Sequence, residues 1–306
     1  MPALDIKAGA EAERLSEAVQ RVGRVLDKAG VDTPSRDARV LVGEATGCDS
    51  ARLIAEPDRP TTQAECQRLA ELVKRRCARE PVSRILGRRE FYGRDFGISP
   101  AVLDPRPDSE TLIDTALALV DEEGWRARPI RILDVGTGSG CLLVTLLAEL
   151  PAASGIGTDV SAEALEVAVQ NAARHGVANR ARFKIRRSLE GLEQPFDLLV
   201  CNPPYMPTQE IAMLAPEVRD HDPRAALDGG VDGLNVYREV IPGVGRVLSS
   251  GWVLFEVAAD QASAVSALLR SVCGQHKSTG MRFASDLGGH VRCVAARIQL
   301  ERRREK

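Results

Sequence analysis

The run Asp134-Val135-Gly136-Thr137-Gly138-Ser139-Gly140 places three glycines at alternate positions, between an apolar stretch and a helix-like stretch. Glycine lets the backbone turn sharply and approach a ligand at contact distance. A dinucleotide site would favour Gly-x-Gly-x-x-Gly, with a pyrophosphate at the helix N-terminus. The spacing here is Gly-x-Gly-x-Gly, which suits a ligand with an amino-acid part and no phosphate. Gly136, Thr137, Gly138, Ser139 and Gly140 are therefore predicted to line a cofactor site, although a glycine-rich turn by itself also has a purely structural interpretation.

Strand-like and helix-like stretches alternate around this loop. Strands are predicted at 130–135, 155–159, 182–186, 196–201 and 252–257, with a terminal pair at 280–286 and 291–299. Helices are predicted at 140–150, 161–174, 235–248 and 261–272. Such alternation is typical of an α/β fold with a mostly parallel sheet covered on both faces. Right-handed crossovers then place the ligand crevice at the carboxyl ends of the strands.

Asp159 ends the predicted strand that follows the glycine loop. A carboxylate at this place can accept hydrogen bonds from both hydroxyls of a ribose. As an isolated residue, Asp159 is equally consistent with the N-cap of the helix that begins near Ser161. In combination with the glycine loop, it favours a bound nucleoside.

The tetrad Asn202-Pro203-Pro204-Tyr205 follows an apolar strand directly. Two prolines fix the backbone and leave carbonyls without neighbouring N–H groups, while Asn202 offers a side-chain carbonyl. Such acceptors can hold both hydrogens of an NH₂ group, and Tyr205 can pack on its flat face. Because the lone pair of an amide or aromatic amine is delocalised, this grip helps to localise it toward a methyl donor. The tetrad predicts methyl transfer to a planar nitrogen, driven by alignment and exclusion of water.

The first part of the chain has a different texture. Residues 10–79 show apolar side chains at three-to-four spacing, which predicts a small helical bundle. A Pro- and Gly-punctuated stretch follows, and it contains Pro105-Arg106-Pro107-Asp108-Ser109-Glu110. We predict a helical domain at 1–85, a connector at 86–110 and an α/β domain at 111–306.

The composition is that of an ordinary globular protein, with 44% hydrophobic residues and a net charge of −2. No bulk charge favours nucleic acid, and neither a signal peptide nor a membrane-length apolar run is present. We expect a cytoplasmic protein without a nucleic-acid or membrane partner. The seven cysteines are odd in number and without a CxxC pair, which argues against a disulfide framework and a metal site. They are Cys48, Cys66, Cys77, Cys141, Cys201, Cys273 and Cys293.

With these motifs in place, the chain closely resembles the HemK/PrmC family, methyltransferases that modify the glutamine of the Gly-Gly-Gln motif in bacterial class 1 peptide-chain release factors. The likeness covers nearly the whole chain. It includes the connector motif, the glycine loop and the tetrad. It also includes Glu80-Pro81-Val82, Glu90-Phe91-Tyr92-Gly93, Pro216-Glu217-Val218, Asp222-Pro223-Arg224-Ala225-Ala226-Leu227-Asp228-Gly229-Gly230 and Asp232-Gly233-Leu234.

The resemblance implies a class I S-adenosylmethionine-dependent methyltransferase fold, a Rossmann-like, seven-stranded, mostly parallel sheet preceded by a small helical bundle. It implies S-adenosyl-L-methionine as the cofactor, bound by the loop Gly136 to Gly140 and by Asp159, Ser188 and Asn202. It further implies that Asn202, Pro203, Pro204 and Tyr205 hold the substrate glutamine. The helical domain would help to dock the release factor, and we expect a monomer.

The chain departs from the family pattern at Arg187 and Ser188. Relatives commonly carry an aspartate and a tryptophan here, beside the adenosine of the cofactor. Their replacement removes an acceptor and a stacking surface, which predicts weakened cofactor binding unless Phe91 or Tyr92 in the connector supplies a substitute platform.

Two other functions remain open. The tetrad can also hold the amino group of adenine, as in a nucleic-acid methyltransferase, but the charge balance and the 4% aromatic content disfavour this interpretation. The changes at Arg187 and Ser188 are also consistent with a binding protein that has lost its cofactor. The intact glycines, Asp159 and Asn202 weigh against that alternative.

Overall fold

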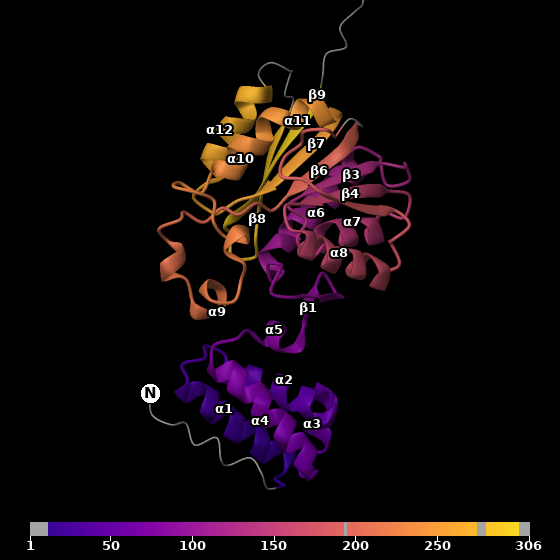
Figure 1. Ribbon diagram of the computed structural model, residues 1–306. Helices are drawn as coiled ribbons and strands as arrows, with labels where there is room; N and C mark the ends of the chain where they lie inside the picture. Colours follow the sequence, from indigo (N-terminus) through magenta and orange to yellow (C-terminus); the bar gives the residue numbers. More distant parts are fainter. Residues whose placement is uncertain (1–11, 193–194, 274–279, 300–306) are drawn as a thin grey trace, which may run out of the picture. The chain divides into compact units, whose positions relative to one another are not determined.

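The computed structural model describes residues 12–192, 195–273 and 280–299 (Figure 1). The chain divides into two compact units. The smaller comprises Met1–Gly87 together with Ala215–His221, and the larger comprises Arg88–Leu214 together with Asp222–Lys306. Residues 88–110, interpreted from the sequence as part of a connector, thus belong to the larger unit. The short segment 215–221 belongs to the smaller unit although it is distant in sequence.

The smaller unit is a helical bundle. Its helices are α1 (Leu15–Lys28), α2 (Pro34–Thr46), α3 (Ser50–Ala55), α4 (Gln63–Cys77) and α5 (Val82–Leu86), with α9 (Pro216–Arg219) in the distant segment. A capping box starts α4, since the Thr62 side chain accepts from the Glu65 N–H and the Glu65 carboxylate accepts from the Thr62 N–H. The apolar residues at three-to-four spacing form one buried core, which includes Leu15, Val22, Leu26, Leu41, Leu69 and Val73.

The larger unit is built on a seven-stranded sheet in the order β5-β4-β3-β6-β7-β9-β8. The strands are β3 (Arg131–Val135), β4 (Ser154–Asp159), β5 (Ala181–Ile185), β6 (Phe196–Cys201), β7 (Leu248–Glu256), β8 (Met281–Ser285) and β9 (Val291–Gln299). β3 to β7 run parallel, and β9 is antiparallel to both β7 and β8. The predicted mostly parallel α/β sheet is confirmed. A separate hairpin, β1 (Arg88–Phe91) and β2 (Arg94–Gly97), begins this unit.

Helices cover both faces of the sheet (Figure 1). One face packs against α6 (Glu110–Glu122), α7 (Cys141–Glu149) and α8 (Ala162–Arg174), and the other against α10 (Asn235–Val240), α11 (Val244–Val247) and α12 (Ala262–Cys273). Alternate strand residues supply the two cores, as in β6, where Val200 faces the first and Leu199 the second. The helix predicted at 235–248 is interrupted by a 3₁₀ turn at Ile241–Gly243, because Pro242 has no N–H for a helical hydrogen bond.

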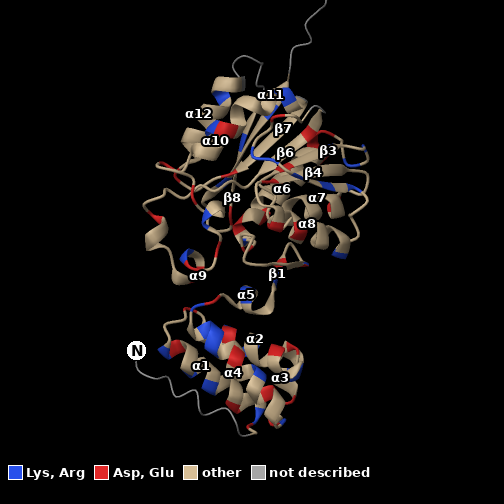
Figure 2. Cartoon of the chain, viewed as in Figure 1, with Lys and Arg blue, Asp and Glu red and all other residues tan. Residues whose placement is uncertain are grey.

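Further features of the described part of the chain are its distribution of charge, its apolar helices, its candidate metal ligands and its cysteines. Segments of both signs are interspersed along the chain (Figure 2). Within the described ranges, no helix is long and apolar enough to cross a membrane, and no group of three or more His, Cys, Asp or Glu side chains is placed to hold a metal ion. The described cysteine side chains form no disulfide. Cys273 ends α12, and its side chain lies outside the described part.

Candidate cofactor and substrate site

The predicted motifs meet at one edge of the sheet. Val135 of β3 pairs with Thr158 of β4 and with Cys201 of β6, so these strands end at the same level. The glycine loop, Asp159 and Asn202 follow directly at those ends. The chain passes from β3 to β4 on one side and reaches β6 on the other, which makes this edge the switch point where open α/β sheets bind their ligands.

The glycine loop turns through left-handed backbone conformations. The φ angle is 73° at Gly136, 53° at Gly138 and 78° at Gly140. Residues with a side chain rarely adopt such values. A Cβ at Gly140 would also lie 3.1 Å from the Cβ of Ala168 in α8. Glycine at this position therefore serves both the turn and the close approach of the loop to the helix.

Asp159 ties the loop to the end of β4. Its Oδ2 accepts a hydrogen bond from the Gly138 N–H at 2.9 Å, and its Oδ1 accepts from the Ser161 N–H at 3.0 Å. The N-cap of α8 is Ser161, whose side chain accepts from the Ala164 N–H. The helix-cap alternative for Asp159 is therefore wrong. Each carboxylate oxygen keeps a further lone pair for a ligand.

Asn171 is a second residue that holds the loop, and no sequence motif predicts it. This side chain on α8 is 1% exposed and donates from Nδ2 to the Ser139 carbonyl at 2.8 Å. It also exchanges two hydrogen bonds with the backbone of Gly97 at the end of β2. An asparagine inside an amphipathic helix carries no local signal for such a role.

Asp134, at the end of β3, is fully buried. Its Oδ2 accepts from the Thr137 hydroxyl at 2.6 Å, whereas Oδ1 has no hydrogen-bond partner among the described residues. Burial raises the pKa of this carboxyl to about 7, against the effects of the Thr137 hydroxyl and the Leu143 backbone. A buried acceptor without a donor is costly, and a ligand with an N–H group at the glycine loop would satisfy it. The only signal of this residue in the sequence is its position two residues before the first glycine of the loop.

The tetrad is locked by backbone packing. Pro203 is buried, and Asn202 is half-buried with its Nδ2 donating to the Ser109 hydroxyl oxygen at 3.1 Å. A Cβ at Gly229 would lie 2.7 Å from the Pro204 carbonyl oxygen, and one at Gly233 would lie 2.2 Å from that of Tyr205. The downstream segment is rich in glycine because its backbone runs against the carbonyls of the tetrad.

Glu256 completes this end of the sheet. It follows Phe255 of β7, the residue that pairs with Cys201 of β6. The Tyr205 hydroxyl donates to Glu256 Oε1 at 3.4 Å, and a hydrogen bond from the Ser109 hydroxyl acts to lower the pKa of the same carboxyl. Burial raises the pKa of Glu256 to about 7, and it also raises the pKa of Tyr205. A glutamate at the end of an apolar strand did not stand out in the sequence.

The two residues that depart from the family pattern lie outside this buried network. The Arg187 side chain is 79% exposed and pairs with Glu239, with 3.1 Å between Nε and Oε1. Ser188 is half-buried, and its hydroxyl oxygen accepts from the Glu190 N–H at 3.4 Å. Neither contact replaces an aromatic surface.

Phe91 does not supply a stacking surface for the adenosine in place of the missing tryptophan. This side chain is 1% exposed and packs edge-to-face on Phe96 in the core, with 6.1 Å between ring centroids. Tyr92 donates its hydroxyl to Asp114 of α6 at 2.8 Å. The prediction of a stacking role for Phe91 is therefore wrong, because no face of its ring is available.

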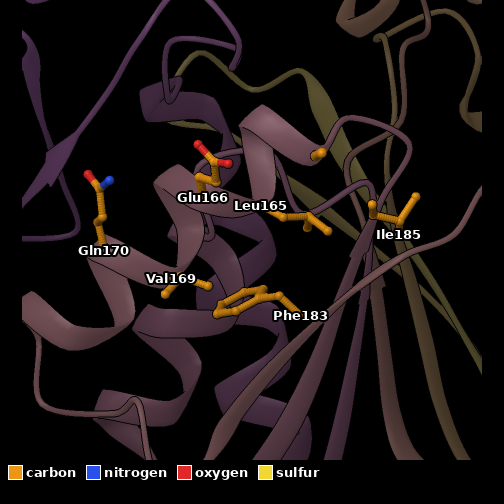
Figure 3. A pocket seen from close by; sticks show the side chains of 7 residues that line it. Leu165, Glu166, Val169, Gln170, Phe183 and Ile185 are labelled. Carbon is orange, nitrogen blue, oxygen red and sulfur yellow. The ribbon is translucent and has the colours of Figure 1, made fainter.

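An apolar pocket of about 370 Å³ lies between α8 and β5 (Figure 3). Its described lining residues are Ala162, Leu165, Glu166, Val169, Gln170, Phe183 and Ile185. None of these is a predicted site residue. Ile185 pairs with Asp159 in the sheet, so one end of the pocket adjoins the carboxyl ends of the strands.

A Rossmann-like sheet with a glycine loop, an acidic residue after the next strand and an acceptor-rich tetrad at the switch point defines a class I methyltransferase. Comparisons with known proteins narrow this class. Residues 17–87 match the family described as "PrmC N-terminal domain", and residues 109–218 match "Methyltransferase small domain".

The sequence relatives are more specific. A release factor glutamine methyltransferase of Agrobacterium fabrum is 45% identical over 275 residues, 89% of this chain and 93% of that protein. The one of Rhodospirillum rubrum is 42% identical over 298 residues, 94% of this chain and 87% of that protein. The catalytic domain of hMettl16, solved in complex with a MAT2A 3′UTR hairpin, shares the fold with a TM-score of 0.54 at 16% identity, over 80% of this chain and 86% of that chain. This chain belongs to the release factor glutamine methyltransferase family.

Proposed function

We propose that this protein transfers a methyl group from S-adenosylmethionine to the side-chain amide nitrogen of the glutamine in the Gly-Gly-Gln motif of a peptide-chain release factor. The observation that carries the proposal is the arrangement of Asn202. Its Nδ2 is bound to Ser109, which leaves Oδ1 as an acceptor at the edge that it shares with the glycine loop. The names of the relatives in Agrobacterium fabrum and Rhodospirillum rubrum support the substrate.

The residues of the loop fit the cofactor. The unpartnered Oδ1 of Asp134 suits the ammonium group of an amino-acid moiety. Asp159 suits the ribose hydroxyls, the backbone of the glycine loop allows close approach, and Ser188 completes the site in this proposal. Asn202 borders the cofactor and acts mainly on the substrate amide. When bound, S-adenosylmethionine supplies a methyl group on a positively charged sulfur that leaves as a neutral thioether.

The tetrad acts on the substrate amide. Asn202 Oδ1 and a carbonyl of the Pro203-Pro204 pair accept the two amide hydrogens, and the ring of Tyr205 packs on the flat face of the group. This grip turns the nitrogen lone pair toward the methyl group, and the nitrogen releases one of its two protons as the N–C bond forms. Because the leaving group departs neutral, alignment and exclusion of water supply most of the rate enhancement.

The direct test is methylation with radiolabelled S-adenosylmethionine. We expect label in intact release factor and none in a release factor whose motif glutamine is replaced by alanine. Duplex DNA and structured RNA serve as competing substrates. Label on adenine would instead support a methyltransferase that acts on nucleic acid. A failure to bind the cofactor in calorimetry would instead support a binding protein.

Asp159→Ala should weaken cofactor binding by about 1–3 kcal/mol, because it removes a charged acceptor from buried or partly buried donors. The substitution also releases the Gly138 N–H, so the loop loses its tie to β4. Calorimetric titration measures the change. Asp58→Ala is a matched control, since the Asp58 side chain is 77% exposed and pairs only with Arg14 among the described residues. An unchanged dissociation constant for Asp159→Ala would remove it from the cofactor site.

Cofactor affinity should depend on pH through Asp134. Its pKa of about 7 means that the carboxyl is protonated in mild acid and becomes an acceptor for the ammonium group as pH rises. We expect the dissociation constant to fall by about tenfold between roughly pH 5.5 and 7, a range in which an α-amino group stays charged. Asp134→Asn should abolish this slope. An equally steep slope in the variant would assign the proton to another group.

The double variant Arg187→Asp with Ser188→Trp should tighten cofactor binding by roughly tenfold, since stacking adds about 0.5–1.5 kcal/mol and a hydrogen bond about 1 kcal/mol. Little is lost, because the exposed Arg187–Glu239 ion pair contributes only marginally. Calorimetry on the wild type, the double variant and Arg187→Ala separates the added contacts from the lost ion pair. Weaker binding by the double variant would show that the site has been rebuilt rather than degraded.

A further inference from the structure

The proposed function requires Asn202 to present its carbonyl oxygen, and not its NH₂ group, to the substrate amide. The two ends of an asparagine amide are nearly equal in size, so packing alone does not choose between them. The Asn202 side chain meets the Ser109 hydroxyl at 3.1 Å. A hydroxyl can donate or accept, so Ser109 by itself leaves both orientations of the amide possible.

Glu256 removes this ambiguity. An ionised carboxylate only accepts hydrogen bonds, and donation from the Ser109 hydroxyl is one of the influences that lower the pKa of Glu256. Once the single proton of Ser109 is directed at Glu256, the serine oxygen can only accept from Asn202. The NH₂ end of Asn202 then faces Ser109, and Oδ1 faces the substrate.

Glu256 is held firmly enough for this role. It is 1% exposed, and its backbone carbonyl accepts from the buried Tyr237 hydroxyl at 2.7 Å. The Tyr205 hydroxyl donates to Oε1, while Oε2 is buried without a hydrogen-bond partner among the described residues. An under-satisfied buried carboxyl costs stability, and a positioning role accounts for its presence beside the tetrad.

We propose that Glu256 and Ser109 are positioning residues that set which end of the Asn202 amide faces the substrate glutamine. The inference rests on the proposed function. Both are assigned roles at one remove from the reacting atoms: Ser109 contacts Asn202, and Glu256 accepts from Tyr205 and acts on Asn202 through Ser109.

In acid, donor and acceptor should exchange places in the hydrogen bonds that link Glu256, Ser109 and Asn202. Burial and the charge of Asp108 together raise the pKa of Glu256 to about 7, while Ser109, Arg292 and Tyr205 act in the opposite direction. The other titratable groups that face it are Tyr237, Cys141, Cys201 and Cys293, all with raised pKa values and therefore neutral near pH 7. A protonated Glu256 can donate to Ser109, whose hydroxyl then donates to Asn202 Oδ1 and turns the NH₂ end toward the substrate.

The first test is the pH dependence of kcat at saturating cofactor, which removes the contribution of Asp134 to cofactor binding. We expect wild-type kcat to fall on the acid side with a midpoint near pH 7, and Glu256→Gln to lose this limb. Ser109→Ala should lower kcat by roughly tenfold, the effect of one lost orienting hydrogen bond. Ser109→Thr keeps the hydroxyl and should retain wild-type kcat within about twofold.

Two controls separate positioning from stability. Ser266→Ala removes another buried serine hydroxyl, bonded to the Ser263 carbonyl on α12, and should leave kcat unchanged. In a double-mutant cycle, Ser109→Ala should add nothing to Asn202→Ala, because the serine acts through the asparagine. Full additivity would contradict the proposal.

The second test does not depend on catalysis. The side-chain amide signal of Asn202 in a ¹⁵N spectrum, assigned by its absence from Asn202→Ala, should shift with pH around a midpoint near 7. The shift should be lost in Glu256→Gln. A wild type that methylates glutamine, with the same pH profile and the same amide signal in all variants, would overturn the positioning role and leave the proposed function intact. A titrating amide signal without methyl transfer would instead overturn the function and keep the hydrogen-bond relay.

Discussion

Asn202→Ala should lower methyl transfer to release factor by a factor on the order of 10² or more, while the dissociation constant of S-adenosylmethionine stays nearly unchanged. The reason is geometric. Alanine removes the Oδ1 acceptor that orients the substrate amide, but the glycine loop and Asp159 keep their own contacts. Single-turnover rates at saturating cofactor measure the loss, and calorimetry measures binding.

The exposed Asn179 is a matched control, since it lies outside the sheet edge and Asn179→Ala should leave both quantities unchanged. Wild-type turnover by Asn202→Ala would remove the tetrad from the chemistry. A parallel loss of binding and turnover would instead place Asn202 in the cofactor site alone.

The sheet was largely predictable, because buried parallel strands are short apolar runs between turn signals. The start of β7 could not be predicted from the sequence. The prediction began at residue 252, whereas the strand begins at Leu248, since Ser250 and Gly251 pair with Gln299 and Ile298 of β9. Polar and glycine residues become strand here through their partner, and a local pattern carries no information about that partner.

The candidate site shows the same difference between local sequence patterns and contacts with distant residues. The glycine loop and the tetrad are each one continuous run of residues directly after a strand. Their position at the same edge of the sheet could therefore be inferred from topology. The contact of Asn202 with Ser109 joins residues 93 positions apart. Glu256 and Asn171 likewise act through tertiary contacts, and neither residue type is unusual in its own element. Such supporting side chains become visible only when the strands are in register.

The segment 215–221 shows a further limit. In the sequence, Pro216-Glu217-Val218 is only part of a family likeness, and nothing local assigns it a partner. In the structure Glu217 belongs to the helical unit. It accepts hydrogen bonds from Arg76, in the last turn of α4, and from Arg79, which follows that helix. Charged side chains can find partners at any sequence separation, so their pairing is not encoded in a local motif.

Arg76→Ala should lower the free energy of unfolding of the helical unit by about 3–5 kcal/mol, the cost of breaking a buried ion pair from one side. The Arg76 side chain is 6% exposed, with Nε 2.7 Å from Asp37 Oδ2 and a terminal nitrogen 3.0 Å from Glu217 Oε1. Glu217 keeps Arg79 as a partner, at 2.6 Å. Asp37, which is 7% exposed, keeps only the Thr33 hydroxyl as a side-chain partner among the described residues and becomes a buried charge without a cation.

Hydrogen exchange of the amides in α2 and α4 measures this loss without requiring the two units to unfold together. Arg52→Ala is the control, because the Arg52 and Glu56 side chains are 51% and 44% exposed and their pair should contribute less than about 0.5 kcal/mol. The amides of Val218 and Arg219, which bond to the Ala215 carbonyl, should also exchange faster in Arg76→Ala, since Glu217 loses one of its two cations. Protection equal to that of Arg52→Ala in all these amides would show that the buried position of Arg76 reflects the packing of its aliphatic stem and not its charge.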